Sequence, residues 1–210
     1  MKRSSFLRNK ILVGLLVMLF LAGIIARATY IHASQSGRHG YTLSSQTTQY
    51  NSNGKVLPLF LETLYMSETG NWLSIQRYAR GKTVETFGVV GQGVFSKREG
   101  DEKVSFLSNL DSPLPILTAE GFQKSSDFLR TETVMGYPTL VTKANNDDQM
   151  EFYHAPAIGG ANLKIVQRSE TSTVITEPTS LVFGEPDSAL IKMPAGLTTS
   201  FDNFNKIHGQ

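Results

Sequence analysis

The chain has 210 residues, no cysteine and a formal net charge of +2, with 40% hydrophobic and 18% charged residues. This length suits one domain of ordinary size, and the composition excludes a polytopic membrane protein and a wholly disordered chain. The lack of cysteine excludes a disulfide scaffold, a thiol nucleophile, an iron–sulfur cluster, a cysteine zinc site and a lipid-modified cysteine.

The basic residues are concentrated at the N-terminus. The first 28 residues contain no Asp or Glu, and they hold Lys2, Arg3, Arg8, Lys10 and Arg27. From residue 29 onward acidic side chains outnumber basic ones. The sequence pI of about 8.8 therefore reflects this leader, and it gives no argument for nucleic-acid binding.

The basic leader runs into an uninterrupted apolar stretch, Ile11 to Ala26. As a helix it would span roughly 24 Å, somewhat less than a hydrocarbon core about 30 Å thick. Residues 1–28 are expected to be a signal peptide, cleaved after Ala26-Arg27-Ala28, or a retained signal-anchor helix with a cytoplasmic N-terminus. The expected membrane-spanning residues include Ile11, Leu16, Phe20 and Ile25.

Three regions are expected to follow the leader. Residues 29–40 are polar and are expected to form a linker, residues 41–200 a single β-rich domain, and residues 201–210 a frayed tail. Everything after the leader is expected to be exported. The protein would be anchored in the membrane by one span, or periplasmic or secreted if the leader is cleaved.

The first half of the domain shows strand patterns separated by turn residues. The Asn-Gly step at Asn53 predicts a hairpin, and Pro58 favours an edge or the start of a strand. Leu73 and Ile75 are expected on one face of their strand and Trp72 on the other. The expected strands are Tyr41 to Tyr50, Leu57 to Met66 (or a short amphipathic segment), Asn71 to Arg80, Thr83 to Val90, Val94-Phe95 and Val104 to Leu107.

A different segment, Asp111 to Phe128, separates these strands from a second set. Its prolines and Gly121 predict a loop with a short helix, capped at Ser112-Pro113. The turns that follow are expected at Gly136 to Pro138, Asn145 to Asp148 and Gly159-Gly160. The expected strands of the second set are Leu129 to Met135, Thr139 to Lys143, Met150 to His154, Leu163 to Arg168 and Thr173 to Phe183, with a short terminal edge element in Gly184 to Gly196.

The fold class predicted from these patterns is mainly β. At least eight strands with hairpin-length connections favour one antiparallel, strongly curved sheet, a half-barrel, with a short helix or loop as cover and the N-terminal hydrophobic helix in addition. Several strands are apolar on both faces, for example at Leu140-Val141 and Phe152-Tyr153. We expect the Pro-rich middle segment to cover one face, and curvature or a ligand to protect the other.

No motif indicates catalysis, a cofactor or a metal. The sequence has no Gly-x-Ser-x-Gly, Walker, Gly-x-Gly-x-x-Gly or His-Glu-x-x-His pattern. His154 is the one histidine inside the expected domain, where a packing or surface role is favoured over that of a base. The acidic turn Asn145 to Asp148 lacks the spacing of a calcium loop and is explained by turn chemistry.

Aromatic residues recur through the expected strands, and a β-core explains most of them. Some can also line an apolar concavity for an acyl chain or an apolar peptide. The candidate cavity-lining residues are Trp72, Phe87, Phe106 and Phe152.

Four segments of the second half follow one another in a characteristic order: TETVMGYPTLVTKA from Thr131, Met150 to Pro156, Ile158 to Val166 and Gly184 to Gly196. This order resembles the LolA-like superfamily of exported lipoprotein carriers and related envelope proteins. The resemblance covers roughly residues 129–196, with a weaker echo in Asn71 to Leu107. It implies a curved half-barrel whose hollow can hold acyl chains and which carries no catalytic residues.

Three functions remain open at this stage. The first is a non-enzymatic, membrane-tethered or exported binding module for a lipid or lipoprotein-like ligand, without cofactor or nucleic-acid partner. The second is a structural or interaction domain of the envelope, with a protein partner not identified by the sequence and no small ligand. The third, which the residues favour least, is a hydrolase built on Asp or Glu pairs. A retained anchor would exclude shuttling between membranes but not ligand binding.

Overall fold

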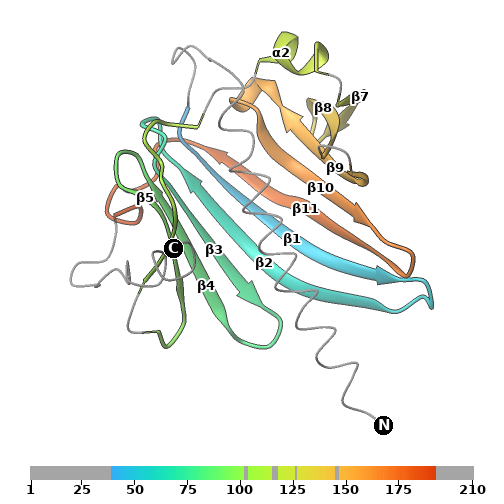
Figure 1. Ribbon diagram of the computed structural model, residues 1–210, viewed down its shortest axis with the longest axis horizontal. Coiled ribbons are helices and arrows are strands. Elements are labelled where there is room, and N and C mark those ends of the chain that lie inside the picture. The colour runs from blue at the N-terminus through green and yellow to red at the C-terminus, as the bar shows by residue number, and fades with distance from the viewer. Residues whose placement is uncertain (1–38, 102–103, 115–117, 126, 145–146, 193–210) are drawn as a thin grey trace, which may run out of the picture.

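The computed structural model describes residues 39–101, 104–114, 118–125, 127–144 and 147–192. Within these ranges it is mainly β, as predicted, with one curved, open antiparallel sheet of 11 strands (Figure 1). The predicted leader, including Ile11, Leu16, Phe20 and Ile25, most of the linker and the tail lie outside the described residues. The strands are β1 (Tyr41–Asn51), β2 (Val56–Met66), β3 (Trp72–Tyr78), β4 (Thr83–Val89), β5 (Gly93–Arg98), β6 (Ser105–Ser108), β7 (Phe128–Val134), β8 (Tyr137–Ala144), β9 (Asp147–Ala155), β10 (Ala161–Arg168) and β11 (Ser172–Phe183).

The sheet is two meanders that meet at the first and last strands. Its order is β6-β5-β4-β3-β2-β1-β11-β10-β9-β8-β7. The central pair β1–β11 runs from Tyr41 opposite Phe183 to Asn51 opposite Ser172, with one register shift after Ser44. Each meander follows from short connections, which bring consecutive strands side by side in antiparallel pairs. The edges are β6 and β7, which are neighbours in sequence but lie at opposite ends of the sheet.

The hairpins differ from the sequence prediction at the turn between β7 and β8 and at the predicted turn Asn145 to Asp148, where β9 already begins at Asp147. The turn between β7 and β8 is Met135-Gly136, both with positive φ (51° and 82°), so Tyr137 and Pro138 belong to β8. A two-residue loop with this backbone continues the twist of the strands, and that favours it over the predicted turn at Gly136 to Pro138. Pro58 lies near the start of β2, as predicted, although β2 is an interior strand. The register with β1 shifts beside it, which accommodates a residue without a backbone N–H.

The connection from β6 to β7 has to pass from one edge of the sheet to the other. It contains helix α2 (Ala119–Gln123), which confirms the predicted loop with a short helix. The predicted cap at Ser112-Pro113 is wrong, because Thr118 is the N-cap and accepts a hydrogen bond from the Gly121 N–H. We call the face that this connection covers the inner face and the opposite one the outer face.

The outer face receives the end of the described chain. Residues 184–192 form turns and no strand, so the predicted terminal edge element is not found as far as residue 192. Ile191 is buried against Leu73 and Phe87 instead, beside Tyr65 and Ile75. A segment of the chain itself, rather than curvature or a ligand, therefore protects this part of the outer face.

Candidate ligand-binding face

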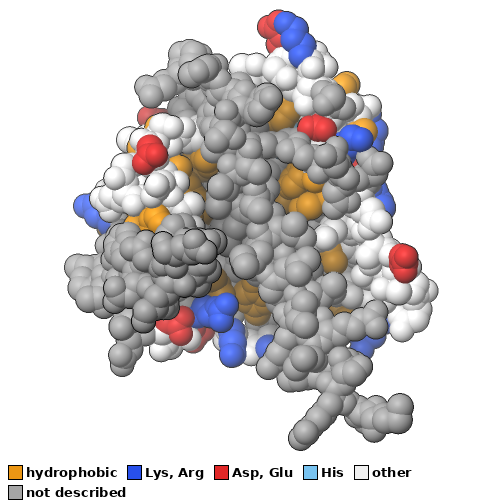
Figure 2. Space-filling model, in the orientation of Figure 1, with side chains coloured by type: hydrophobic (Ala, Val, Ile, Leu, Met, Phe, Trp, Pro, Cys, Tyr) orange, Lys and Arg blue, Asp and Glu red, His pale blue; other side chains and the backbone are white. Residues whose placement is uncertain are grey.

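The inner face carries an apolar patch where β1 begins and β2 ends. In the sheet register Tyr41 is opposite Met66, and Met66 is opposite Trp72. Space-filling atoms show hydrophobic side chains gathered on this side of the sheet (Figure 2). The patch, which we call the apolar patch, consists of Tyr41, Leu43, Leu64, Met66, Trp72, Val94 and Leu163.

Trp72 lies flat against the neighbouring strand because that strand has a glycine opposite it. A Cβ atom on Gly88 would come within 2.0 Å of Trp72 Nε1, which no structure tolerates without a shift. Trp72 is 3% exposed and packs with Val94 and Leu110. Gly88 thus provides the space in which the single tryptophan of the chain is held.

Two polar atoms in this region have no hydrogen-bond partner within the described part of the chain. They are Trp72 Nε1 and Ser108 Oγ. Trp72, Gly88, Val94 and Ser108 follow one another across β3, β4, β5 and β6, so both atoms belong to one row of the inner face. A buried polar group without a partner costs about 1–3 kcal/mol. The row therefore carries a buried donor and a buried hydroxyl that no described residue uses.

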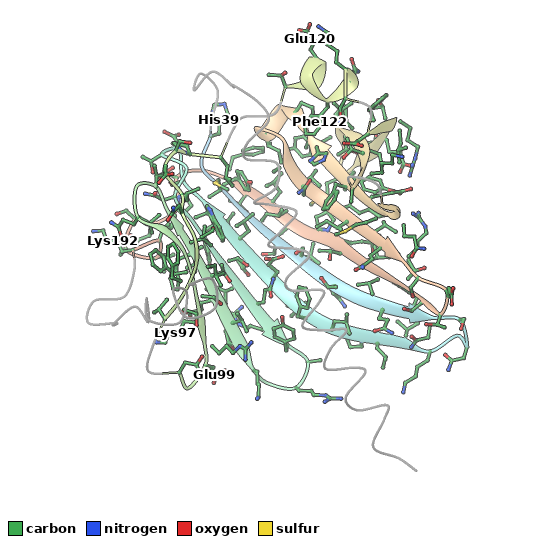
Figure 3. All side chains as sticks on the ribbon, viewed as in Figure 1. His39, Lys97, Glu99, Glu120, Phe122 and Lys192 are labelled. Carbon is green, nitrogen blue, oxygen red and sulfur yellow. The ribbon has the colours of Figure 1, made fainter. Side chains whose placement is uncertain are left out.

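The β6–β7 connection covers the patch and the neighbouring strands at two points. Leu110 and Leu114 pack at Trp72 and Val94. Phe122, on α2, stacks on His154 of β9 with a ring separation of 4.2 Å, and Figure 3 shows it between the helix and the strands. His154 is buried, and its Nε2 lies 2.9 Å from Thr142 Oγ1. His154 therefore has a packing role, as the sequence predicts.

A polar network interrupts the inner face beyond the apolar patch. Glu62 of β2 is 6% exposed and accepts hydrogen bonds from Ser74 Oγ (2.5 Å) and Gln76 Nε2 (3.3 Å). The Tyr78 hydroxyl donates in turn to Gln76 Oε1 (3.1 Å). Burial raises the pKa of Glu62, and the hydrogen bonds only partly oppose this effect. Burial, followed by the charge of Glu62, also raises the pKa of Tyr78.

The raised pKa of Glu62 predicts that the variant Glu62→Gln is more stable than the parent at neutral pH. The folded state holds the Glu62 proton more tightly than the unfolded state does. Its contribution to stability is thus complete at pH below the unfolded value of about 4.5 and is lost as the pH rises through the raised folded value. Each kcal/mol that glutamine recovers raises the melting temperature by about 2–4 °C.

Thermal unfolding of both proteins between pH 4 and pH 8 measures this difference. The gain should grow with pH and vanish near pH 4, whereas Glu170→Gln in the exposed β10–β11 turn should show no such trend. A Glu62→Gln variant less stable than the parent at pH 8 would contradict the assignment.

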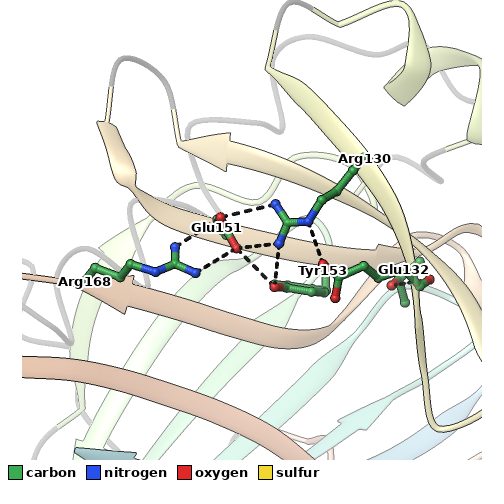
Figure 4. Close-up of polar contacts among 6 residues, drawn as sticks. Arg130, Glu132, Glu151, Tyr153 and Arg168 are labelled. Atoms are coloured by element: carbon green, nitrogen blue, oxygen red, sulfur yellow. Dashed lines mark hydrogen bonds and ion pairs between the residues drawn. The ribbon is translucent and has the colours of Figure 1, made fainter. Parts of the chain in front are cut away.

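The outer face carries a compact charged cluster on β7, β9 and β10 (Figure 4). Glu151 Oε2 accepts from Arg130 Nη2 (3.0 Å), Tyr153 OH (3.1 Å) and Arg168 Nη2 (3.3 Å). Arg130 Nη1 and Arg168 Nη1 lie 3.3 and 3.1 Å from Glu151 Oε1. Arg130 also donates from Nε to Glu132 Oε1 at 2.5 Å. The cluster links strands β7, β9 and β10 of the second meander.

The surroundings of Glu151 act on its pKa in opposite directions. Burial raises the pKa, but hydrogen bonds from Arg130, Arg168 and Tyr153 outweigh burial and lower the pKa from 4.5 to about 2. Burial and the hydrogen bond to Glu151 raise the pKa of Tyr153 to about 12. Hydrogen bonds to Glu151 and Glu132 raise the pKa of Arg130. Glu151 therefore stays ionised at the pH values where Glu62 takes up a proton.

The lowered pKa of Glu151 predicts an acid-sensitive fold. Its contribution to stability is present above pH 4.5 and is lost as the pH falls to about 2. We expect Glu151→Gln to lower the free energy of unfolding by about 2 kcal/mol at pH 7 and to remove this part of the acid dependence.

Urea unfolding at pH 7 and pH 3 tests this expectation. Glu132→Gln is the matched control, because Glu132 is 41% exposed and binds Arg130 at the surface, where an ion pair contributes about 0–1 kcal/mol. Equal losses in the two variants would show that Glu151 has no special role.

The four predicted cavity residues do not share one face. Trp72 and Phe152 belong to the inner face, Trp72 in the apolar patch and Phe152 in a separate cluster with Met150 and Ile165. Phe87 is opposite Leu73 and Phe95, and Phe95 is opposite Phe106, so Phe87 and Phe106 belong to the outer face. A ligand-binding role for any of the four stays a prediction.

Sequence reasoning missed Glu62 and the Glu151 cluster. Strand alternation was the available indication, because it places Ser74 and Gln76 on the face of Trp72, and the register of β2 with β3 adds Glu62. Burial and cross-strand pairing, however, appear only once the register is known. The described residues hold no group of His, Asp and Glu that could bind a metal ion. None of the helices within the described ranges is long and apolar enough to cross a membrane.

No family model and no curated protein matches this sequence. Solved structures with a similar fold include PNGF-II, with 13% identity and a TM-score of 0.45 over 80% of this chain and 33% of that one. A LolA superfamily protein from Nitrosomonas europaea has 9% identity and a TM-score of 0.37 over 81% of this chain and 96% of that one. An outer membrane lipoprotein-sorting protein domain from Vibrio parahaemolyticus has 11% identity and a TM-score of 0.31 over 82% and 92%.

These similarities concern the fold alone. The structures found include LolA superfamily and lipoprotein-sorting proteins, the group that the segments from Thr131 onward resemble. This chain spans about a third of the length of PNGF-II.

Proposed function

We propose that this chain is a non-enzymatic binding module of the cell envelope whose inner sheet face takes a hydrophobic ligand, a lipid or the acyl part of a lipoprotein. The observation that carries the proposal is the apolar patch beneath a single crossing connection, with Trp72 Nε1 and Ser108 Oγ unpartnered within the described residues. Apolar contacts would supply most of the affinity, at about 25 cal/mol per Å² of surface removed from water. The resemblance of residues 129–196 to LolA-like proteins favours the same ligand class.

The arrangement of the ionisable groups supports a binding role rather than catalysis. Glu62 and Glu151 lie on opposite faces of the sheet, so they cannot act together on one bond. His154 is buried in a stack with Phe122 and hydrogen-bonds Thr142. A general acid and a general base that work together must reach the same reacting centre, and Glu62 and Glu151 do not.

The leader supports an exported location. Its basic residues and apolar run predict export, with the N-terminus in the cytoplasm if the segment is retained. We propose that residues 1–28 tether the β domain to the membrane through the linker at 29–40. The domain would then receive its ligand from the adjacent bilayer or from a partner protein.

The single tryptophan makes ligand binding directly measurable. We expect fatty acids or phospholipids carrying bromine atoms on the acyl chain to quench Trp72 fluorescence in a saturable manner, because Trp72 lies in the apolar patch. Leu64→Ala should weaken binding about tenfold, which corresponds to about 1.4 kcal/mol. Leu61→Ala, on the outer face of the same strand and 54% exposed, should leave it unchanged.

Native mass spectrometry of protein extracted from membranes provides the second measurement. Acyl species that co-purify with the parent and are reduced in Leu64→Ala support the proposal. A folded protein that shows neither quenching nor bound lipid would contradict it, and would leave the structural or interaction domain as the function.

A further inference from the structure

Strand β7 ends the sheet with one side unpaired. It is seven residues long, Phe128–Val134, and among the described strands it pairs with β8 alone. The other edge, β6, has only four residues. Leu129 and Met135, at the two ends of β7, are 44% and 45% exposed. An edge strand of this length presents a row of backbone donors and acceptors to which another strand can pair.

The β7–β8 turn and the pairing with β8 determine which residues of β7 direct their backbone N–H and C=O groups away from β8. Val134 and Tyr137 flank the two-residue turn and form the hydrogen-bonded pair that closes the hairpin. Thr139 Oγ1 donates to the Glu132 carbonyl, so this carbonyl also faces β8. Thr133 is opposite Pro138, which has no N–H to donate. By alternation, Thr131 and Thr133 direct their N–H and C=O groups away from the sheet, whereas Leu129 lies in the register shift, where the alternation is interrupted.

We propose that β7 pairs antiparallel with β7 of a second copy of this chain, about a two-fold axis at Thr131. In this register Thr131 opposes Thr131 of the second copy, and Thr133 opposes Leu129. The residues between them also oppose one another, and they place Arg130 of each copy opposite Glu132 of the other. The two sheets would continue into one another across the axis.

The charges select this register. Arg130 and Glu132 both lie on the outer face, and Glu132 is 41% exposed, so it can bind an arginine across the edge. Opposite charges at directly opposed positions favour strand pairing, whereas like charges disfavour it. Moving the axis to Thr133, the other residue with outward backbone groups, removes both charge pairs.

Two features of β7 oppose pairing with unrelated strands. These features are the charged side chains of β7 and the register shift between Phe128 and Arg130. In a two-fold pair the charges become complementary, and only the first residues of the strand are affected by the shift. The edge is thus selective for its own sequence. The paired area is small, so the association is expected to be weak and best captured by cross-linking.

The chain has no cysteine, and each single-cysteine variant therefore reports one contact. In the proposed pair the two Thr131 Cα atoms lie about 5.5 Å apart, which suits a disulfide. The full chain carrying Thr131→Cys, in native membranes or detergent, should form a covalent dimer under mild oxidation. Thr133→Cys should not cross-link to itself, because its two copies would be offset by about 13 Å along the strands.

The same register predicts that a mixture of Leu129→Cys and Thr133→Cys chains forms a mixed disulfide. Adding Glu132→Arg to Thr131→Cys should lower cross-linking at least fivefold, while the circular dichroism spectrum shows that the fold is kept. Thr171→Cys in the exposed β10–β11 turn gives the rate of random collisions. Cross-linking of Thr131→Cys no faster than Thr133→Cys or Thr171→Cys would overturn the proposal, as would cross-linking of Thr131→Cys only to a different protein.

Discussion

The pairing of β1 with β11 is the constraint on which the rest of this structure depends. It joins the first and last strands along their whole length, from Tyr41 opposite Phe183 to Asn51 opposite Ser172. The remaining strands then extend outward in two meanders, and the chain has to travel between the two edges across one face. That crossing defines the inner face and brings Leu110, Leu114 and Phe122 over it. The candidate binding face is therefore a consequence of strand order, not of a local motif.

The pKa values of the buried carboxyl groups on the two faces shift in opposite directions. Glu62 on the inner face has only uncharged hydrogen-bond donors in its network, and burial raises its pKa. Glu151 on the outer face is held by two arginines and a tyrosine, and its pKa falls to about 2. The Glu62 network places polar side chains in the middle of the inner face. The ionised cluster instead fixes the register of β7, β9 and β10.

The edges of the open sheet are the places where another chain can add a strand. An open sheet has two edges, and this one leaves a short strand at one end and a seven-residue strand at the other. Arg130 binds Glu151 within the chain. In the proposed pair it would also lie opposite Glu132 of the second copy. A binding face and a pairing edge can therefore coexist without competing for the same surface. The apolar patch lies on β1, β2, β3, β5 and β10, whereas the pairing edge is β7.

The sequence by itself determined the fold class, nearly every strand and the short helix before β7, because alternation and turn residues are local properties of the chain. It also placed Trp72 and Leu73 on opposite faces of their strand, and the structure confirms that placement. Only the tertiary structure decided that Phe87 and Phe106 lie away from Trp72, that Ile191 covers the outer face, and that Arg130, Glu151 and Arg168 meet. These outcomes depend on register and strand order, which are set by pairings between residues far apart in the sequence and leave no periodic trace within any one strand.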